Sequence, residues 1–167
     1  MNRYLIALGS NQRHPRHGLP SMILRAAVDE LRGEGVLVEA VSPTLRSRPL
    51  GPSLREYANG AAVISTHLDP PELLELLQQV ERRFGRRRQG QRWRSRTLDL
   101  DVVLWSGGFW ADEALVIPHR EFRKRDFVLA PAAKIAPDWR DPLTGLTIRH
   151  LAARLARPLT RRPPHPR

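Results

Sequence analysis

The sequence contains no cysteine and no long hydrophobic run. Without cysteine the chain can form no disulfide, thiolate zinc site, iron–sulfur cluster or cysteine nucleophile, and this composition fits a reducing compartment. The apolar run after Met1 ends at Gly9, and no stretch approaches the roughly 20 residues of a membrane span. We therefore expect a cytoplasmic protein that does not bind membranes.

Acidic residues are also scarce relative to basic ones: 17 against 28, for a formal net charge of +11. All the basic residues except Lys124 and Lys134 are arginines. This balance favours phosphate-rich partners such as nucleic acid, membrane headgroups or a nucleotide. The sequence has neither a G-x-x-x-x-G-K-[ST] loop nor a G-x-G-x-x-G segment, which excludes the P-loop and Rossmann modes of nucleotide binding.

The length of 167 residues suits one compact domain, which we expect to cover residues 1–157. We also expect the protein to act as a monomer. Residues 158–167 are rich in proline and arginine, a composition that predicts a disordered basic tail. We expect that this tail can be deleted without loss of activity.

Hydrophobic periodicity predicts alternating strands and helices. Strands are expected at about 3–8, 36–45, 59–66 and 98–105, and helices at about 20–33, 69–84 and 147–155. Residues 118–129 are expected to form a loop that runs into a further helix. The order β-α-β-β-α-β predicts a ferredoxin-like α+β fold. In this fold the helices pack mainly on one face of an antiparallel sheet, and here extra C-terminal elements are added.

Two carboxylates alternate with apolar residues in the strand at 98–105. Residues i and i+2 of a strand share a face, so Asp99 and Asp101 point away from the core side, which we assign to Leu98, Leu100, Val102 and Leu104. Neighbouring carboxylates repel each other unless a cation lies between them, and oxygen ligands alone suit Mg²⁺. The alternative is an amphipathic strand whose polar face happens to use aspartate.

Arginines crowd the segment before this strand. Eight of them, and no acid, lie between Arg82 and Arg96, and a second basic run covers residues 120–125. Such runs often form a solvated face, but next to a carboxylate pair they favour the binding of a metal–polyphosphate. His119 is a candidate phosphate contact, or simply a surface histidine.

Tyr57, Asn59 and Phe127 could bind a flat heterocycle. Aromatic rings stack on such a ring, and an asparagine amide both donates and accepts hydrogen bonds at its edge. The alternative interpretation places both aromatic residues in the core.

Four segments carry a resemblance to a known family: Leu8–Asn11, Arg46–Pro52, Arg96–Asp101 and Ile117–His119. In their order and at similar spacing they resemble 6-hydroxymethyl-7,8-dihydropterin pyrophosphokinase, an enzyme of folate biosynthesis. The resemblance covers about residues 3–140. It implies a diphosphotransferase that moves pyrophosphate from ATP to the hydroxymethyl group of the pterin, with release of AMP.

The resemblance also implies a role for individual residues. Two Mg²⁺ ions would bind Asp99 and Asp101, while Arg86 and Arg92 would assist catalysis from a mobile loop. ATP would contact Gln78, Glu81, Arg88, Trp93, Arg96, His119 and Arg125. The pterin would contact Ser47, Leu50, Tyr57, Asn59 and Phe127. Arg94 and Ala114 depart from the family pattern: Arg94 would add charge and change the backbone freedom of the loop, and Ala114 replaces a basic nucleotide contact of some members.

Two other functions compete with this one. A basic ferredoxin-like sheet resembles RNA-binding modules, but Asp99 and Asp101 on the exposed face would repel phosphate in the absence of a metal. We therefore expect no nucleic-acid partner. A relative that binds the nucleotide without turnover is the second alternative.

Overall fold

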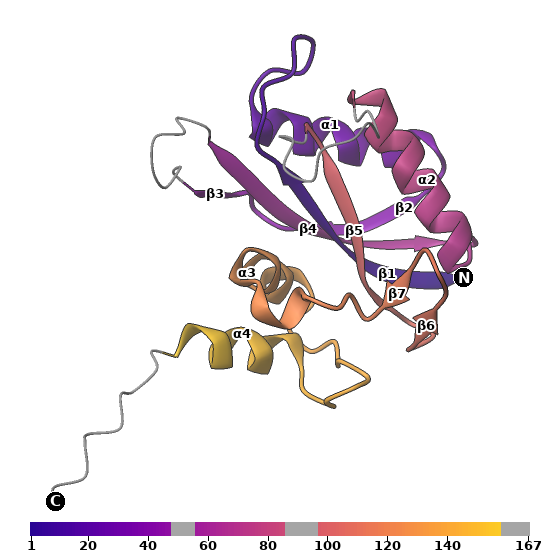
Figure 1. Ribbon diagram of the computed structural model, residues 1–167, viewed down its shortest axis with the longest axis vertical. Helices are drawn as coiled ribbons and strands as arrows, with labels where there is room; N and C mark the ends of the chain where they lie inside the picture. The colour runs from indigo at the N-terminus through magenta and orange to yellow at the C-terminus, as the bar shows by residue number, and fades with distance from the viewer. Residues whose placement is uncertain (48–55, 86–96, 158–167) are drawn as a thin grey trace, which may run out of the picture.

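The computed structural model describes residues 1–47, 56–85 and 97–157, and shows an antiparallel sheet between two layers of helices (Figure 1). The strands run in the order β2 (Leu37–Val41), β4 (Tyr57–Thr66), β1 (Asn2–Ser10) and β5 (Asp99–Trp105). A further strand, β3 (Leu45–Ser47), pairs with residues 57–59 of β4, whereas β2 pairs with residues 62–65 of that strand. Every pairing is antiparallel. β4 and β1 therefore lie in the middle of the sheet, with β2 and β5 outside them, which confirms the ferredoxin-like prediction.

One face of the sheet is covered by α1 (Pro20–Gly33) and α2 (Pro70–Arg83), in agreement with the predicted ranges. Their apolar stripes pack on Tyr4, Ile6 and Leu8, which alternate along β1. A capping box begins α2: the Asp69 carboxylate accepts the Glu72 N–H at 3.0 Å, and the Glu72 carboxylate accepts the Asp69 N–H at 2.8 Å. These reciprocal bonds satisfy two of the free donors of the first turn.

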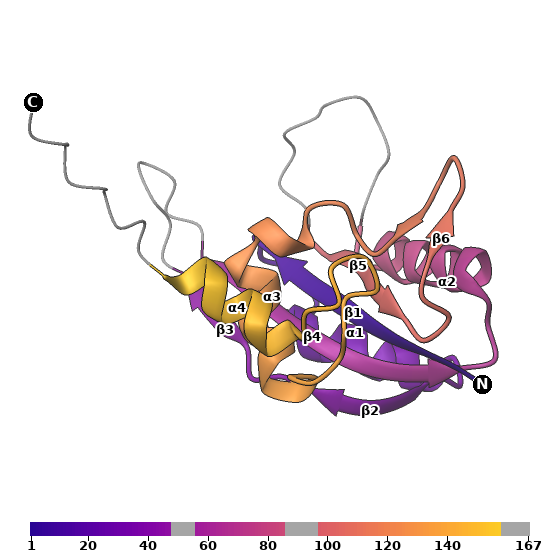
Figure 2. The ribbon, with the colours of Figure 1, turned by 90° about the horizontal axis from the view of Figure 1, so that it is seen from below.

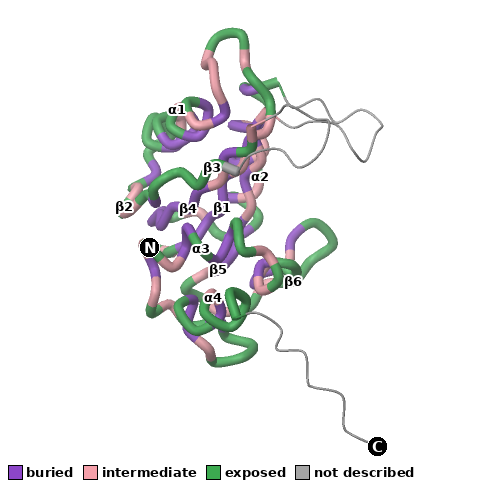
Figure 3. Tube along the Cα trace, turned by 90° about the vertical axis from the view of Figure 1, so that its left-hand side faces the viewer, coloured by how far each residue is buried: buried purple, intermediate pink, exposed green. Residues whose placement is uncertain are grey.

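The C-terminal elements cover the other face (Figure 2). They comprise the short helix η1 (Phe122–Lys124), α3 (Asp126–Ile135) and α4 (Ile148–Ala156). Leu5 and Ala7 of β1 point to this side and form a second core with Phe122, Leu129 and Leu151. The extra C-terminal elements expected from the sequence therefore complete a second helical layer, and the sheet is buried on both sides along its middle (Figure 3).

A buried ion pair fastens this second layer. Asp141 is fully buried and accepts bonds from the Arg123 guanidinium at 2.6 and 2.7 Å. Burial alone would raise the pKa of Asp141, but the bonds from Arg123, Thr144 and the Leu143 N–H together lower it. The pair connects η1 to the loop before α4, and no sequence pattern pointed to it.

Two strand predictions need correction. The strand expected at 36–45 is divided at Pro43, where the Ser42 hydroxyl, not a backbone carbonyl, accepts the Ala61 N–H at 2.9 Å. In β5 the pairing shifts at Val103, because Ile6 pairs with Val102 but Leu5 pairs with Leu104. This bulge turns Leu104 into the second core, so the prediction that it shares a face with Leu100 and Val102 was wrong.

A small hairpin of β6 (Trp110–Ala111) and β7 (Val116–Ile117) follows the turn at Gly107–Gly108. These two short strands were not among those expected from the sequence. None of the described helices is long and apolar enough to cross a membrane. The tail predicted for residues 158–167 lies outside the described residues.

Candidate active site

The predicted site residues of the sheet lie in two neighbouring rows across β4, β1 and β5. Gly9 pairs with Asn59 on one side and with Asp99 on the other. In the next row, Ala7 pairs with Ala61 and with Asp101. Residues paired directly across strands share a face, so Asn59, Asp99 and Asp101 point to the same side of the sheet.

Gly9 keeps the space between these polar side chains open. A Cβ at this position would lie 3.3 Å from the Asn59 Oδ1, closer than ordinary van der Waals contact. The residue was not among the predicted site residues. The sequence signal was a glycine at the end of a buried strand, which often marks close approach of a ligand or another backbone group.

Asp99 and Asp101 are both partly buried, and the buried Leu100 between them is tied to α2. Its N–H donates to the Glu81 Oε1 at 2.8 Å, and Glu81 itself is only 2% exposed. This bond fixes the strand at the point where the two carboxylates leave it. Gln78 lies one turn before Glu81 on the same side of α2 and is partly exposed.

His119 faces Asp101. The His119 N–H donates to the Val103 carbonyl at 3.0 Å, and its Nδ1 accepts the Glu121 N–H at 3.1 Å. The ring proton of a neutral His119 therefore lies on Nε2, which is 3.7 Å from the Asp101 Oδ2. The structure thus brings together two residues that the sequence analysis had selected separately.

A groove of about 490 Å³ opens beside this pair. Its walls come from β5, from the segment Asp112–Val116 and from His119–Glu121, and Leu74 of α2 also lines it. Bonds from the Trp110 indole and from the Ala114 and Leu115 N–H groups lower the pKa of Asp112. Ala114 lies on the groove wall, so no basic side chain is supplied from that position.

Tyr57 and Phe127 are each 40% exposed and belong to neither core, which argues against the core interpretation. Tyr57 precedes Asn59 by two residues on β4, and therefore points to the same side of the sheet. Phe127 lies in the first turn of α3, which covers that side, and the Arg125 guanidinium lies 5.7 Å from the centre of its ring. Ser47 pairs with Tyr57 at the end of β3.

Six of the predicted site residues lie outside the described parts of the chain: Leu50, Arg86, Arg88, Arg92, Trp93 and Arg96. Among the described residues, Tyr57, Asn59, Asp99 and Asp101 share one face of the sheet, and His119 faces Asp101.

The carboxylates of Asp99 and Asp101 fit the ligand preference of a magnesium ion. Within residues 1–47, 56–85 and 97–157 no group of three or more His, Asp or Glu side chains could hold a metal by itself. Two carboxylates on adjacent rows are the usual protein contribution when substrate phosphates supply the other oxygen ligands.

Comparison with known proteins agrees with this geometry. Residues 5–137 match the family described as 7,8-dihydro-6-hydroxymethylpterin-pyrophosphokinase. The chain belongs to this family. The relatives are named 2-amino-4-hydroxy-6-hydroxymethyldihydropteridine pyrophosphokinase: the one from Methylorubrum extorquens is 39% identical over 93% of this chain and 94% of its own length. The one from Synechocystis is 44% identical over 75% of this chain, a match that spans 64% of the relative.

Solved structures support the fold. Plasmodium falciparum HPPK-DHPS matches 92% of this chain with a TM-score of 0.69 and 12% sequence identity, and the match spans 41% of that longer chain. At this identity the similarity establishes the shared fold of the pyrophosphokinase family.

Proposed function

We propose that this chain transfers the pyrophosphate group of ATP to the hydroxymethyl group of 6-hydroxymethyl-7,8-dihydropterin and releases AMP. The observation that carries the proposal is the shared face of Asn59, Asp99 and Asp101, with Gly9 between them. A residue suited to a heterocycle edge thereby lies next to a carboxylate pair suited to a metal–phosphate. Membership of the pyrophosphokinase family supports the same reaction.

The pterin binds at the Asn59 end of this face. The Asn59 amide can match a ring edge that both donates and accepts hydrogen bonds. Tyr57 and Phe127 offer exposed rings for stacking on the two faces of the heterocycle. Backbone groups at Ser47 and Leu50 complete the pocket in this proposal.

ATP binds at the Asp101 end, with its nucleoside in the groove beside His119. Asp99 and Asp101 would hold two Mg²⁺ ions, and magnesium bound there neutralises phosphate charge and polarises the attacked phosphoryl group. The remaining contacts are assigned to Gln78, Glu81, Arg88, Trp93, Arg96, His119 and Arg125. Of these, His119 has the clearest geometric support, because its Nε2 lies 3.7 Å from the Asp101 Oδ2.

The chemistry is an in-line displacement. The pterin hydroxymethyl oxygen forms a bond to the β-phosphorus of ATP while the bond from that phosphorus to the α-bridging oxygen breaks, and AMP leaves with that oxygen. The hydroxyl proton goes to a carboxylate of the Asp99–Asp101 pair. Arg86 and Arg92 stabilise the charge on the transferred group.

Release of AMP from Mg-ATP, measured with and without the dihydropterin, tests the proposal. Wild-type protein should produce AMP only when the pterin is present. Asp101→Asn should reduce the rate by at least about 100-fold while the circular dichroism spectrum is retained, because it removes a charge from the phosphate site. Asp138→Asn is the matched control, since Asp138 is exposed and pairs with Arg149 in the C-terminal layer. Absence of pterin-dependent AMP with wild-type protein would refute the proposed function.

Magnesium as the cation, action as a monomer and a cytoplasmic location stay predictions of the sequence. The cation is tested by replacing Mg²⁺ with Ca²⁺, which has a larger radius and a more flexible coordination geometry, and should support little or no AMP release.

A further inference from the structure

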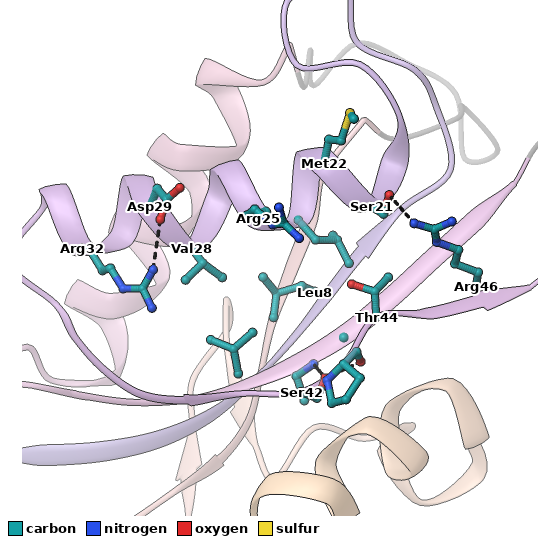
Figure 4. A pocket seen from close by; sticks show the side chains of 15 residues that line it. Leu8, Ser21, Met22, Arg25, Val28, Asp29, Arg32, Ser42, Thr44 and Arg46 are labelled. Atoms are coloured by element: carbon teal, nitrogen blue, oxygen red, sulfur yellow. Dashed lines mark hydrogen bonds and ion pairs between the residues drawn. The ribbon is translucent and has the colours of Figure 1, made fainter.

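Besides the groove at His119, the structure has a hollow of about 730 Å³, whose lining residues are shown in Figure 4. It lies on the face of the sheet opposite Asp99 and Asp101. It lies between α1 and the segment that joins β2 to β3. Leu8 and Gly60 belong to its floor, and both face α1: a Cβ at Gly60 would lie 3.7 Å from the Leu24 side chain. The sheet itself therefore divides this hollow from Asp99 and Asp101.

The floor of the hollow is apolar. Leu8, Leu24 and Val28 line it and are each no more than 5% exposed. At the rim, Met22 and Val41 are 56% and 44% exposed, so apolar surface continues outward from the floor. A ligand seated here would remove this surface from water, which is favourable.

The rim is basic. Arg25 and Arg32 reach the hollow from α1 and Arg46 from β3, and Asp29 is the one acidic residue among the described residues that line it (Figure 4). Arg32 is paired with Asp29 at 3.0 Å, and Arg46 donates to the Ser21 hydroxyl at 3.3 Å and lies 3.5 Å from a Glu56 carboxylate oxygen. Arg25 has no hydrogen-bond or ion-pair partner among the residues that the structure describes.

We propose that this hollow binds a small organic anion with a flat apolar body. Its volume lies in the range of small-molecule sites, and the combination of an apolar floor with a few polar groups at the rim is typical of them. The apolar body lies on Leu8, Leu24 and Val28. The carboxylate or phosphate of the ligand is bound by Arg25, and Arg46 adds a second guanidinium from the opposite wall.

This site is distinct from the candidate catalytic site. A ligand bound in it would contact residues 42–46, the end of the β2–β3 connection and the start of β3. The wall from Ser42 to Arg46 continues directly into Ser47, which pairs with Tyr57. A bound anion would therefore contact the same segment that carries predicted pterin contacts, from the opposite face of the sheet.

Binding of three related probes tests the proposal: 2-naphthoate, 2-naphthyl phosphate and the uncharged 2-naphthamide. Titration calorimetry on the full chain should show that at least one anion binds at least about tenfold more tightly than the amide, because an ionic hydrogen bond to Arg25 is added. A preference for the phosphate or for the carboxylate identifies which headgroup the site is built for. Amide NMR shifts should centre on residues 21–32 and 42–46.

Arg25→Gln should weaken anion binding by at least about tenfold while leaving 2-naphthamide binding and pterin-dependent AMP release unchanged. Arg25 is exposed, so the substitution does not threaten the fold. Arg149→Gln, an exposed arginine of α4, is the matched control and should bind as wild type. Equal binding of anions and amide, undiminished binding by Arg25→Gln, or NMR shifts centred on Asn59 and Asp101 would each overturn the proposal. None of these results depends on whether the catalytic assignment is correct.

Discussion

The Nε2 atom of His119 lies 3.7 Å from the Oδ2 atom of Asp101. Two hydrogen bonds hold the imidazole in this orientation. The ring Nδ1 accepts the Glu121 N–H, and the backbone N–H of His119 donates to the Val103 carbonyl. At this distance the two groups do not share a direct hydrogen bond, so the Nε2–H is available to a ligand oxygen that enters between or beside them.

We therefore expect His119→Ala to slow AMP release by about ten- to a hundredfold, because it removes one hydrogen bond to a charged phosphate. The loss should appear in kcat/KM for ATP, measured at saturating pterin. The exposed His67, in the loop before α2, provides the control: His67→Ala should behave as wild type. An unchanged kcat/KM in His119→Ala would remove this residue from the site.

Gly9→Ala tests the open row between Asn59 and Asp99. The new methyl group would lie 3.3 Å from the Asn59 Oδ1 and displace the amide. The KM for the pterin should rise by about tenfold while the KM for ATP changes little. Gly33→Ala, where an added Cβ meets nothing within 4 Å, is the matched control and should leave both constants unchanged. A pterin KM that is the same in both variants would contradict the assignment of Asn59.

Asp141→Asn should destabilise the protein by about 2–3 kcal/mol at pH 7, because the partly buried Arg123 loses its carboxylate partner. The lowered pKa of Asp141 sets the pH dependence. Its contribution is complete above the unfolded-state pKa of about 4 and is lost as the pH falls through the lower folded-state value. Urea unfolding of both proteins should therefore show a constant difference near neutrality that narrows below about pH 4. A difference that grows on acidification would contradict the pKa direction.

Local signals in the sequence were sufficient for most of the fold. The helix expected at 69–84 is present as α2, and its start is a local feature because the capping box of Asp69 and Glu72 involves only residues three positions apart. The bulge at Val103 could not be predicted in this way. It arises from the pairing of β5 with β1, and a strict period of two therefore assigned Leu104 to the wrong face.

The candidate site likewise contains residues with a local sequence signal and residues whose role depends on strand pairing. Asp99 and Asp101 were recognisable because they alternate with buried residues inside one strand. Their relation to Asn59 depends on the register of three strands, and Gly9 acquires its role only in that register. The pair of Arg123 and Asp141 likewise joins separate segments of the C-terminal layer, so neither residue had a local signature.

The most direct test of the central claim is a ³¹P NMR analysis of wild-type protein with Mg-ATP and 6-hydroxymethyl-7,8-dihydropterin. Wild-type protein should form AMP and a pterin diphosphate ester in equal amounts, with two coupled phosphorus signals for the ester. Formation of ADP with a pterin monophosphate, or hydrolysis of ATP without any phosphorylated pterin, would contradict the proposed pyrophosphate transfer.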